Sequence, residues 1–397
     1  MTDPLGQSQI LPYHKGIAAA GHEITLVSFE KKIRYQTTGA ELALEIRKYG
    51  IEWYPFTYTK SPPVFATIWD IFRLILVVVE IQKRKKFDIV HCRSYITTFA
   101  GHYLQKKFGM KFIFDMRGFW ADERVEGGLW NLKKPIYNLV YKYFKRKEKQ
   151  WLQDANHIIS LTENAKEYIS SPKSGFLKDI GQKITVIPCC TDTQLFNSQN
   201  VDFQKVVNIR QDFKISSGQM VIGYLGSVGT WYMLDEMLLF FKQIKSKNED
   251  AVFVILTAEN PEFIIAKAIK NNIDANDLRI CEVKRVDLPN YISIFDLSLC
   301  FVKPSFSKKA SSPTKLGELM AMGIPVICNA GVGDVDLLLN KYKTGYLLPN
   351  FDESDIQKAV DFTEDLLQID KQKIREVAVE VFGLERGVEA YLLSYEC

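Results

Sequence analysis

The feature that most constrains the fold is a regular alternation of short apolar runs with longer amphipathic segments. The apolar runs have the length and composition of buried strands, and the segments between them have helical spacing. Strands separated by helices lie parallel in one sheet. The predicted strands of the first half are 24–29, 51–54, 89–92, 111–115, 157–161 and 184–187, and its predicted helices include 9–20, 67–85, 97–107, 135–153 and 163–169.

The alternation lapses into polar, mixed sequence near 191–216 and then begins again. A chain of 397 residues is long enough for two domains. We therefore expect two Rossmann-like, doubly wound α/β domains, 1–198 and 199–383, with a C-terminal helix at about 384–397 packing back on the first. Ligands of such folds bind beyond the carboxyl ends of the strands, which predicts a site in the cleft between the domains. The predicted strands of the second series are 221–225, 252–257, 278–283, 297–302, 325–329 and 345–348.

Cysteine and histidine spacing, an uncharged stretch and the start of the sequence exclude whole classes of protein. The seven cysteines include no C-x-x-C pair, and the five histidines lack the i, i+4 spacing of a helix-borne metal site, so we expect no metal. The longest stretch without charge, 215–234, contains Gly, Ser, Gln and Thr and does not read as a membrane span. No cleaved export signal opens the sequence, which predicts a cytoplasmic protein.

Charge is distributed unevenly along the chain. Residues 1–190 contain 29 Lys+Arg against 18 Asp+Glu, a charge of +11, whereas the remainder has 22 against 29, a charge of −7. The densest clusters, 83–86 and 142–149, are interleaved with aromatic and aliphatic residues. This fits an anionic membrane surface or another polyanion, and solvated helix faces are the alternative. The predicted apolar side of the first of these helices consists of Ile68, Ile71, Phe72, Ile75, Val78 and Val79.

The segment 311–327 carries the most chemical information. We interpret Ser312 as a helix N-cap, Pro313 as the first helical residue and Gly323 as the helix end, before another strand. A helix start at a strand end presents free backbone N–H groups that bind phosphate. Ser311, Ser312, Thr314 and Lys315 add donors to this site.

Glu318 follows Lys315 by three residues and therefore shares its helix face. Its carboxylate can accept hydrogen bonds from a sugar diol. The alternative is an ordinary capped helix with a solvated Lys315/Glu318 pair. The residues alone leave both interpretations open.

This segment resembles the C-terminal signature of the retaining glycosyltransferases of family 4, two-domain GT-B enzymes that use nucleotide sugars. Other segments resemble the same family in the expected order: 3–9 with Gly6 is similar to its N-terminal glycine-containing loop, 88–94 to the strand that carries a His, and 186–192 to the passage into the linker. The resemblance implies transfer of a sugar, with retention, from a nucleotide sugar to a glycan or lipid-linked acceptor. It also implies a UDP-sugar donor, no obligatory metal, and a role in polysaccharide or lipopolysaccharide assembly.

The sequence departs from the family pattern at several positions. Ala310 stands where the family often has a first glutamate, and 226–232 lacks the Arg and Lys that commonly grip the donor diphosphate. Arg117 lies nearest the position of a frequent catalytic-site His. The glycine-containing segment opens the chain almost at once, so the first N-terminal strand of the GT-B fold is expected to be missing.

The resemblance implies a set of site residues. Lys315 would stabilise the leaving diphosphate, and His91 and Arg117 would position the transferred sugar or the acceptor. Structural alternatives are a half-buried His91 and an ion pair of Arg117 with Asp115 or Asp122. The predicted donor-binding residues are Gly6, Gly226, Ser227, Gly229, Ser312, Thr314, Lys315 and Glu318.

Two rival classes of function remain. We expect no nucleic-acid partner under any of the three interpretations. The run 223–229 follows a strand, and with Glu259 it could be a dinucleotide fingerprint of a nicotinamide-dependent oxidoreductase, although its spacing is not G-x-G-x-x-G. A non-catalytic, membrane-associated protein that binds nucleotide sugars is the other. If the protein is a transferase, we expect it to be a cytoplasmic enzyme that docks peripherally on the inner face of the cell membrane.

Overall fold

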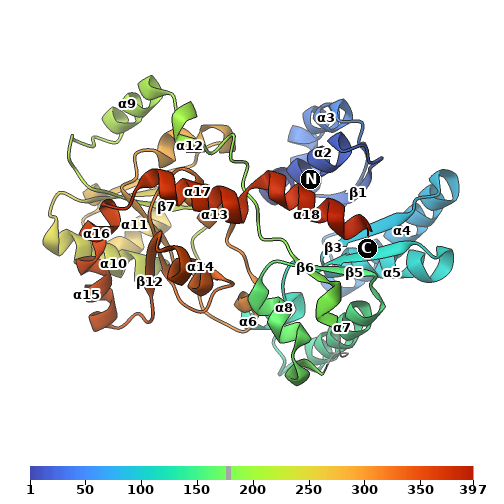
Figure 1. The fold of residues 1–397 in the computed structure, drawn as a ribbon. Helices are drawn as coiled ribbons and strands as arrows, with labels where there is room; N and C mark the ends of the chain where they lie inside the picture. The colour runs from blue at the N-terminus through green and yellow to red at the C-terminus, as the bar shows by residue number, and fades with distance from the viewer. Residues whose placement is uncertain (176–179, 397) are drawn as a thin grey trace. The chain divides into compact units, whose positions relative to one another are not determined.

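The computed structural model describes residues 1–175 and 180–396 and divides the chain into two compact units (Figure 1). The first unit comprises Met1–Cys190 together with the C-terminal segment from Leu384, and the second comprises Thr191–Gly383. The chain thus leaves the first unit, builds the second and returns. Residues 191–198, expected in the first domain, lie in the second unit.

The first unit contains two separate parallel sheets. Strands β3 to β6 form one sheet in sequence order, and β1 and β2 form the other. Phe112, Ile113 and Phe114 of β4 are wholly buried, as expected for a parallel strand covered on both faces. Among the described residues, β1 is the first strand along the chain. The strands are β1 (Thr25–Glu30), β2 (Glu52–Thr57), β3 (Ile89–Arg93), β4 (Lys111–Asp115), β5 (His157–Ser160) and β6 (Ile184–Val186).

Segment 3–9, expected as a loop, is instead a short helix, α1 (Pro4–Gln9), with Pro4 in its first turn. Gly6 lies so close to Met1 that a Cβ there would fall 2.4 Å from the Met1 carbonyl oxygen. The other helices of this unit are α2 (Leu11–Ala19), α3 (Lys32–Lys48), α4 (Pro63–Lys85), α5 (Ser94–Phe108), α6 (Trp120–Glu126), α7 (Pro135–Asp154) and α8 (Glu163–Ser170), with 3-10 turns η1 (Pro172–Ser174) and η2 (Ile180–Lys183).

The C-terminal helix α18 (Leu384–Glu396) packs against α2 in the first unit. Glycines allow the close approach: a Cβ on Gly16 would meet Val388 Cγ2 at 2.6 Å, and one on Gly387 would meet Tyr13 Cε1 at 2.8 Å. Tyr13 and Tyr391 also contact edge to face. The last helix of the chain therefore completes the core of its first unit.

The second unit is a six-stranded parallel sheet in the order β12-β11-β10-β7-β8-β9. This order places the first strand of the unit in the middle, with the chain winding outward on both sides, which is the doubly wound arrangement. The central strands are wholly buried. The strands are β7 (Val221–Leu225), β8 (Val252–Leu256), β9 (Leu278–Cys281), β10 (Leu297–Cys300), β11 (Val326–Asn329) and β12 (Gly345–Leu348).

Helices cover both faces of this sheet (Figure 1). They are α9 (Phe203–Asp212), α10 (Leu234–Lys247), α11 (Pro261–Lys270), α12 (Leu288–Ile292), α13 (Thr314–Ala321), α14 (Val335–Tyr342), α15 (Glu353–Asp361), α16 (Thr363–Leu367) and α17 (Lys371–Phe382), with 3-10 turns η3 (Ser198–Asn200), η4 (Ala275–Asp277), η5 (Arg285–Asp287) and η6 (Ser307–Ala310). The prediction of two parallel-sheet α/β domains is confirmed.

Candidate donor-binding site

The signature helix α13 begins at Thr314, one residue later than predicted. Pro313 holds the N-cap position in extended conformation, so the interpretation of Ser312 as N-cap is wrong. Proline's fixed φ suits an extended N-cap as well as a first helical position. Pro313 has no polar side chain that could cap α13, but its carbonyl accepts a hydrogen bond from the Leu316 N–H at 3.0 Å. The remaining N–H groups at the helix start suit an anion, with Ser312 and Thr314 half-buried beside them.

Lys315 is buried in the first turn of α13, with 7% of its surface exposed. Its Nζ donates a hydrogen bond to Tyr224 Oη at 2.7 Å and lies 4.1 Å from the centroid of the Tyr224 ring. The centroid of the Tyr232 ring lies 3.9 Å from the same Nζ. Burial lowers the pKa of Lys315 to about 8. The side chain is therefore a cation held against aromatic rings.

The loop after β7 passes directly beside this lysine. A Cβ on Gly226 would fall 3.0 Å from Lys315 Nζ, and Gly226 adopts a φ of +117°, which favours glycine. The carbonyl of Ser227 accepts a hydrogen bond from Tyr224, and Gly229 accepts one from the Tyr232 N–H at 3.0 Å. The predicted residues Gly226, Ser227 and Lys315 thus lie together, with Gly229 in the same loop.

A second lysine approaches the same loop and was missed by sequence reasoning. Lys308 of η6 is buried, and its Nζ lies 3.9 Å from the centroid of the Trp231 ring. Trp231 and Tyr232 stand in the segment where the resembling family has its cations. In this chain the segment instead contributes two aromatic rings. Trp231 packs on Lys308 of η6, and Tyr232 packs on Lys315 of α13. The only signal in the sequence was the pair Lys308-Lys309 upstream of the signature.

Glu318 is buried and pairs with Arg285, whose Nη1 lies 2.5 Å from Glu318 Oε1. Burial raises the pKa of Glu318, and the Arg285 guanidinium opposes this. The same guanidinium lies 5.0 Å from the centroid of the Phe196 ring. The alternative of a solvated Lys315/Glu318 pair is therefore wrong. Arg285 was not predicted, because its distance from Glu318 along the sequence gives no pattern.

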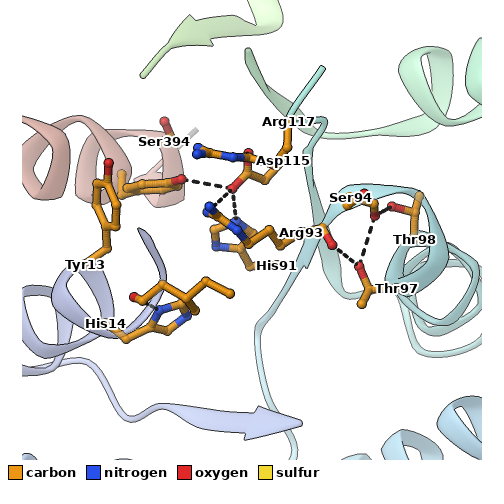
Figure 2. Close-up of polar contacts among 12 residues, drawn as sticks. Tyr13, His14, His91, Arg93, Ser94, Thr97, Thr98, Asp115, Arg117 and Ser394 are labelled. Carbon is orange, nitrogen blue, oxygen red and sulfur yellow. Dashed lines mark hydrogen bonds and ion pairs between the residues drawn. The ribbon is translucent and has the colours of Figure 1, made fainter. Parts of the chain in front are cut away.

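In the first unit, Asp115 at the carboxyl end of β4 organises a buried polar cluster (Figure 2). Its Oδ2 accepts hydrogen bonds from Tyr391 Oη at 2.9 Å and Arg93 Nη1 at 3.3 Å. Burial alone would raise the pKa of Asp115, but Arg117, His91 and Arg93 hold it well below its usual value. The cluster joins β3, β4 and α18.

His91, predicted to act on the transferred sugar or acceptor, lies within this cluster. One ring nitrogen, Nδ1, lies 2.8 Å from Tyr395 Oη, and the other, Nε2, lies 3.4 Å from Asp115 Oδ2. Its ring also stacks with that of His14, whose pKa burial lowers to about 4. Since both ring nitrogens of His91 face partners inside the unit, the contacts favour its structural alternative.

Arg117 follows β4 with a left-handed backbone, φ +54°, an uncommon conformation for a residue with a side chain. Its side chain is 9% exposed, with Nε 3.9 Å from Asp115 Oδ1 and Nη2 3.3 Å from Cys189 Sγ. Nη1 finds no hydrogen-bond partner among the described residues. Of the two predicted ion pairs, the one with Asp115 forms, whereas Asp122 pairs with Lys145.

Among the described residues, no group of three or more His, Cys, Asp or Glu side chains could hold a metal ion. Within residues 1–175 and 180–396, no helix combines the length and apolar character that a membrane crossing requires.

Comparison with protein families identifies the chain. Residues 11–195 match the model described as Glycosyltransferase Family 4, and residues 206–376 match that described as Glycosyl transferases group 1. The chain therefore belongs to the family 4 glycosyltransferases of GT-B fold. The run 223–229 lies inside the group 1 match, which removes the basis for reading it as a dinucleotide fingerprint. None of the curated proteins compared with the sequence matches it.

Solved structures of low sequence identity share the fold. A glycosyltransferase from Rickettsia africae superposes with a TM-score of 0.71 at 17% identity, covering 97% of this chain and 93% of that one. Anabaena Alr3699/HepE in complex with UDP and glucose gives 0.67 at 13%, covering 94% and 99%. WaaG, a glycosyltransferase involved in lipopolysaccharide biosynthesis, gives 0.66 at 14%, covering 98% and 95%.

Proposed function

We propose that the protein transfers a sugar, with retention of anomeric configuration, from a UDP-sugar to a glycan or lipid-linked acceptor. The observation that carries the proposal is the buried Lys315, placed at the start of α13 against the glycine loop that follows β7. A cation, a helix N-terminus and a close backbone together suit a diphosphate. The complex of the Anabaena neighbour with UDP and glucose supports a uridine donor.

The chemistry assigned to these groups is electrostatic. As the bond between sugar and diphosphate breaks, negative charge grows on the leaving oxygen, and Lys315, Lys308 and the first-turn N–H groups of α13 stabilise it. Glu318, fixed by Arg285, accepts from the donor ribose hydroxyls. The departing diphosphate takes the proton from the attacking hydroxyl. No obligatory metal and no protein nucleophile enter this proposal.

We assign acceptor binding to the first unit, with Arg117 as its anion-binding residue. The support is Arg117 Nη1, buried and without a hydrogen-bond partner in the described residues, at the carboxyl end of a parallel strand. A guanidinium in that state suits a phosphate or carboxylate group. We further propose a cell-surface glycan or lipopolysaccharide pathway and a peripheral location on the inner membrane face.

A panel of nucleotide sugars tests the proposal. Titration calorimetry should show binding of one or more UDP-sugars, and proton NMR of the product should show the donor's anomeric configuration. Lys315→Ala should reduce turnover because the leaving group loses a charge. Binding without product on any acceptor would instead favour a non-catalytic nucleotide-sugar-binding protein, and unchanged turnover in Lys315→Ala would remove that residue from the mechanism.

A further inference from the structure

Helix α4 presents a stripe of large apolar side chains to solvent. Within one helix, five such residues are between 51% and 71% exposed, although aliphatic and aromatic side chains of this size normally pack inward. We call them the α4 stripe: Phe65, Ile68, Trp69, Phe72 and Leu76. The helix belongs to the first unit (Figure 1).

The stripe follows the helical repeat and lies opposite the packed face. Phe65, Trp69, Phe72 and Leu76 are spaced by three or four residues and Ile68 flanks them, which places all five on one side of the α-helix. Residues about half a turn away are buried, among them Leu74 and Ile81. The predicted membrane-facing side is therefore only partly right: Ile68 and Phe72 are exposed, whereas Ile71, Ile75, Val78 and Val79 are half-buried.

The stripe runs directly into positive charge. Lys83 continues it at the same helical spacing, and Arg84 and Lys86 are exposed beside it. Among the described side chains of α4, two are carboxylates. Asp70 is buried and accepts hydrogen bonds from Thr59, and Glu80 lies 3.5 Å from Arg84. The face therefore combines exposed aromatic side chains with a cationic end.

Helix α7 repeats this combination. Ile136, Leu139 and Tyr143 are 53%, 70% and 43% exposed, while its Glu148 is buried. Exposed cations accompany them at positions 142, 146 and 149. Both α4 and α7 pack on α5, so the two helices belong to one helical layer of the first unit.

We infer that the α4 stripe docks this protein on an anionic lipid bilayer. Charge complementarity selects this occupant: exposed Trp and Phe insert at the boundary between headgroups and acyl chains, and adjacent Lys and Arg attract anionic headgroups. This inference deepens the proposed function, because a lipid-linked acceptor would be presented at such a bilayer. The link to the acceptor rests on that proposed function. The docking surface itself depends only on α4 and its flanking charges.

Vesicle sedimentation of the full chain tests the inference. Binding is expected to phosphatidylcholine vesicles that contain one quarter phosphatidylglycerol, and to weaken as salt rises. Trp69→Ser/Phe72→Ser should abolish most binding. Lys83→Glu/Arg84→Glu/Lys86→Glu should weaken it about a hundredfold at low salt. Ile33→Ser/Leu44→Ser is the matched control, since both residues are exposed on α3 of the same unit, at 78% and 65%, and should leave binding unchanged.

A spectroscopic readout locates the contact. Trp69 is the most exposed tryptophan among the described residues, so brominated lipids should quench part of the fluorescence, and Trp69→Phe should remove that part. Equal binding to neutral vesicles, no binding at low salt, or a Trp69-dependent dimer in place of vesicle binding would overturn the inference. UDP-sugar titration of the same variants separates the two proposals, because the stripe variants should bind donor normally whether or not they bind lipid.

Discussion

Burial of Lys315 lowers the folding stability of the second unit but favours the binding of an anionic ligand. Its pKa of about 8 lies well below the usual value of a lysine, because the folded chain removes the ammonium group from water. The unfolded chain therefore binds the proton more tightly than the folded one. Below pH 8 this difference costs the folded state about 3 kcal/mol. A bound diphosphate would recover this free energy by placing negative charge beside Nζ.

Lys315→Met should accordingly separate the two properties. At pH 7 we expect the variant to be more stable than wild type, by roughly 1–3 kcal/mol in urea unfolding, because the buried charge is gone. Its UDP affinity should fall at least about tenfold.

The pH dependence supplies the control for this variant. Wild-type affinity should be constant near pH 7 and fall as pH rises through 8 to 10, since Lys315 then loses its proton. The variant should show no such fall. A wild-type affinity that is flat across that range would contradict the assignment.

Lys308 and Lys309 offer a second, matched comparison at this scale. They are neighbours on η6, but Lys308 is buried over the Trp231 ring, whereas Lys309 is exposed. We expect Lys308→Met to weaken UDP binding by about 1–2 kcal/mol, and Lys309→Met to leave it within error, as titration calorimetry would show. Equal losses would mean that charge alone, and not position, matters in this turn.

At the level of secondary-structure elements, α18 is held to β3 and β4 by tyrosine hydroxyls. Tyr391 Oη donates to Asp115, and Tyr395 Oη lies within hydrogen-bond distance of His91. The other oxygen of Asp115, Oδ1, accepts no hydrogen bond from a described residue and has only the Arg117 ion pair at 3.9 Å. The helix therefore contributes more than apolar contact, because it satisfies a buried carboxylate.

Tyr391→Phe should destabilise the protein by about 1–3 kcal/mol, because a wholly buried acceptor loses a donor. Urea unfolding would measure this. Leu393→Ala is a suitable comparison, since that side chain is 57% exposed on the same helix and should cost little. A larger loss in the comparison variant would show that the hydroxyl is not what holds α18.

At the scale of the whole molecule, the chain builds its first unit from both of its ends. The second unit is inserted between Cys190 and Leu384. Loss of the last helix should therefore damage the first unit, whose core includes Tyr13 and Tyr391, and not the unit nearest in sequence.

A chain ending at Gly383 should show this selectivity. We expect the first unit to lose more than about 3 kcal/mol, because the buried Tyr391 alone accounts for that much. UDP binding by the second unit should persist. Urea unfolding with and without UDP would resolve the two transitions, and loss of UDP binding in the truncated chain would contradict the division.

The sequence by itself determined the strands, their parallel arrangement and the helix start within 311–327 to one residue, because hydrophobic periodicity and helix-end chemistry are local. The resemblance to the family assigned Gly226 and Lys315 to one donor site, and the structure brings these two residues together. Two local predictions were wrong. A short helix replaced the expected loop at 3–9. Helix α13 begins one residue later than predicted, because proline fits both the N-cap and the first helical position.

Tertiary structure decided which charges are buried and what they meet. Arg285 reaches Glu318, Lys308 covers Trp231, and Tyr391 reaches Asp115 across sequence separations that carry no pattern. It also decided which side of α4 is exposed, because a helix that is apolar on most of its surface does not specify its packed face. Local sequence fixes an element, whereas burial and partner choice depend on contacts between distant elements.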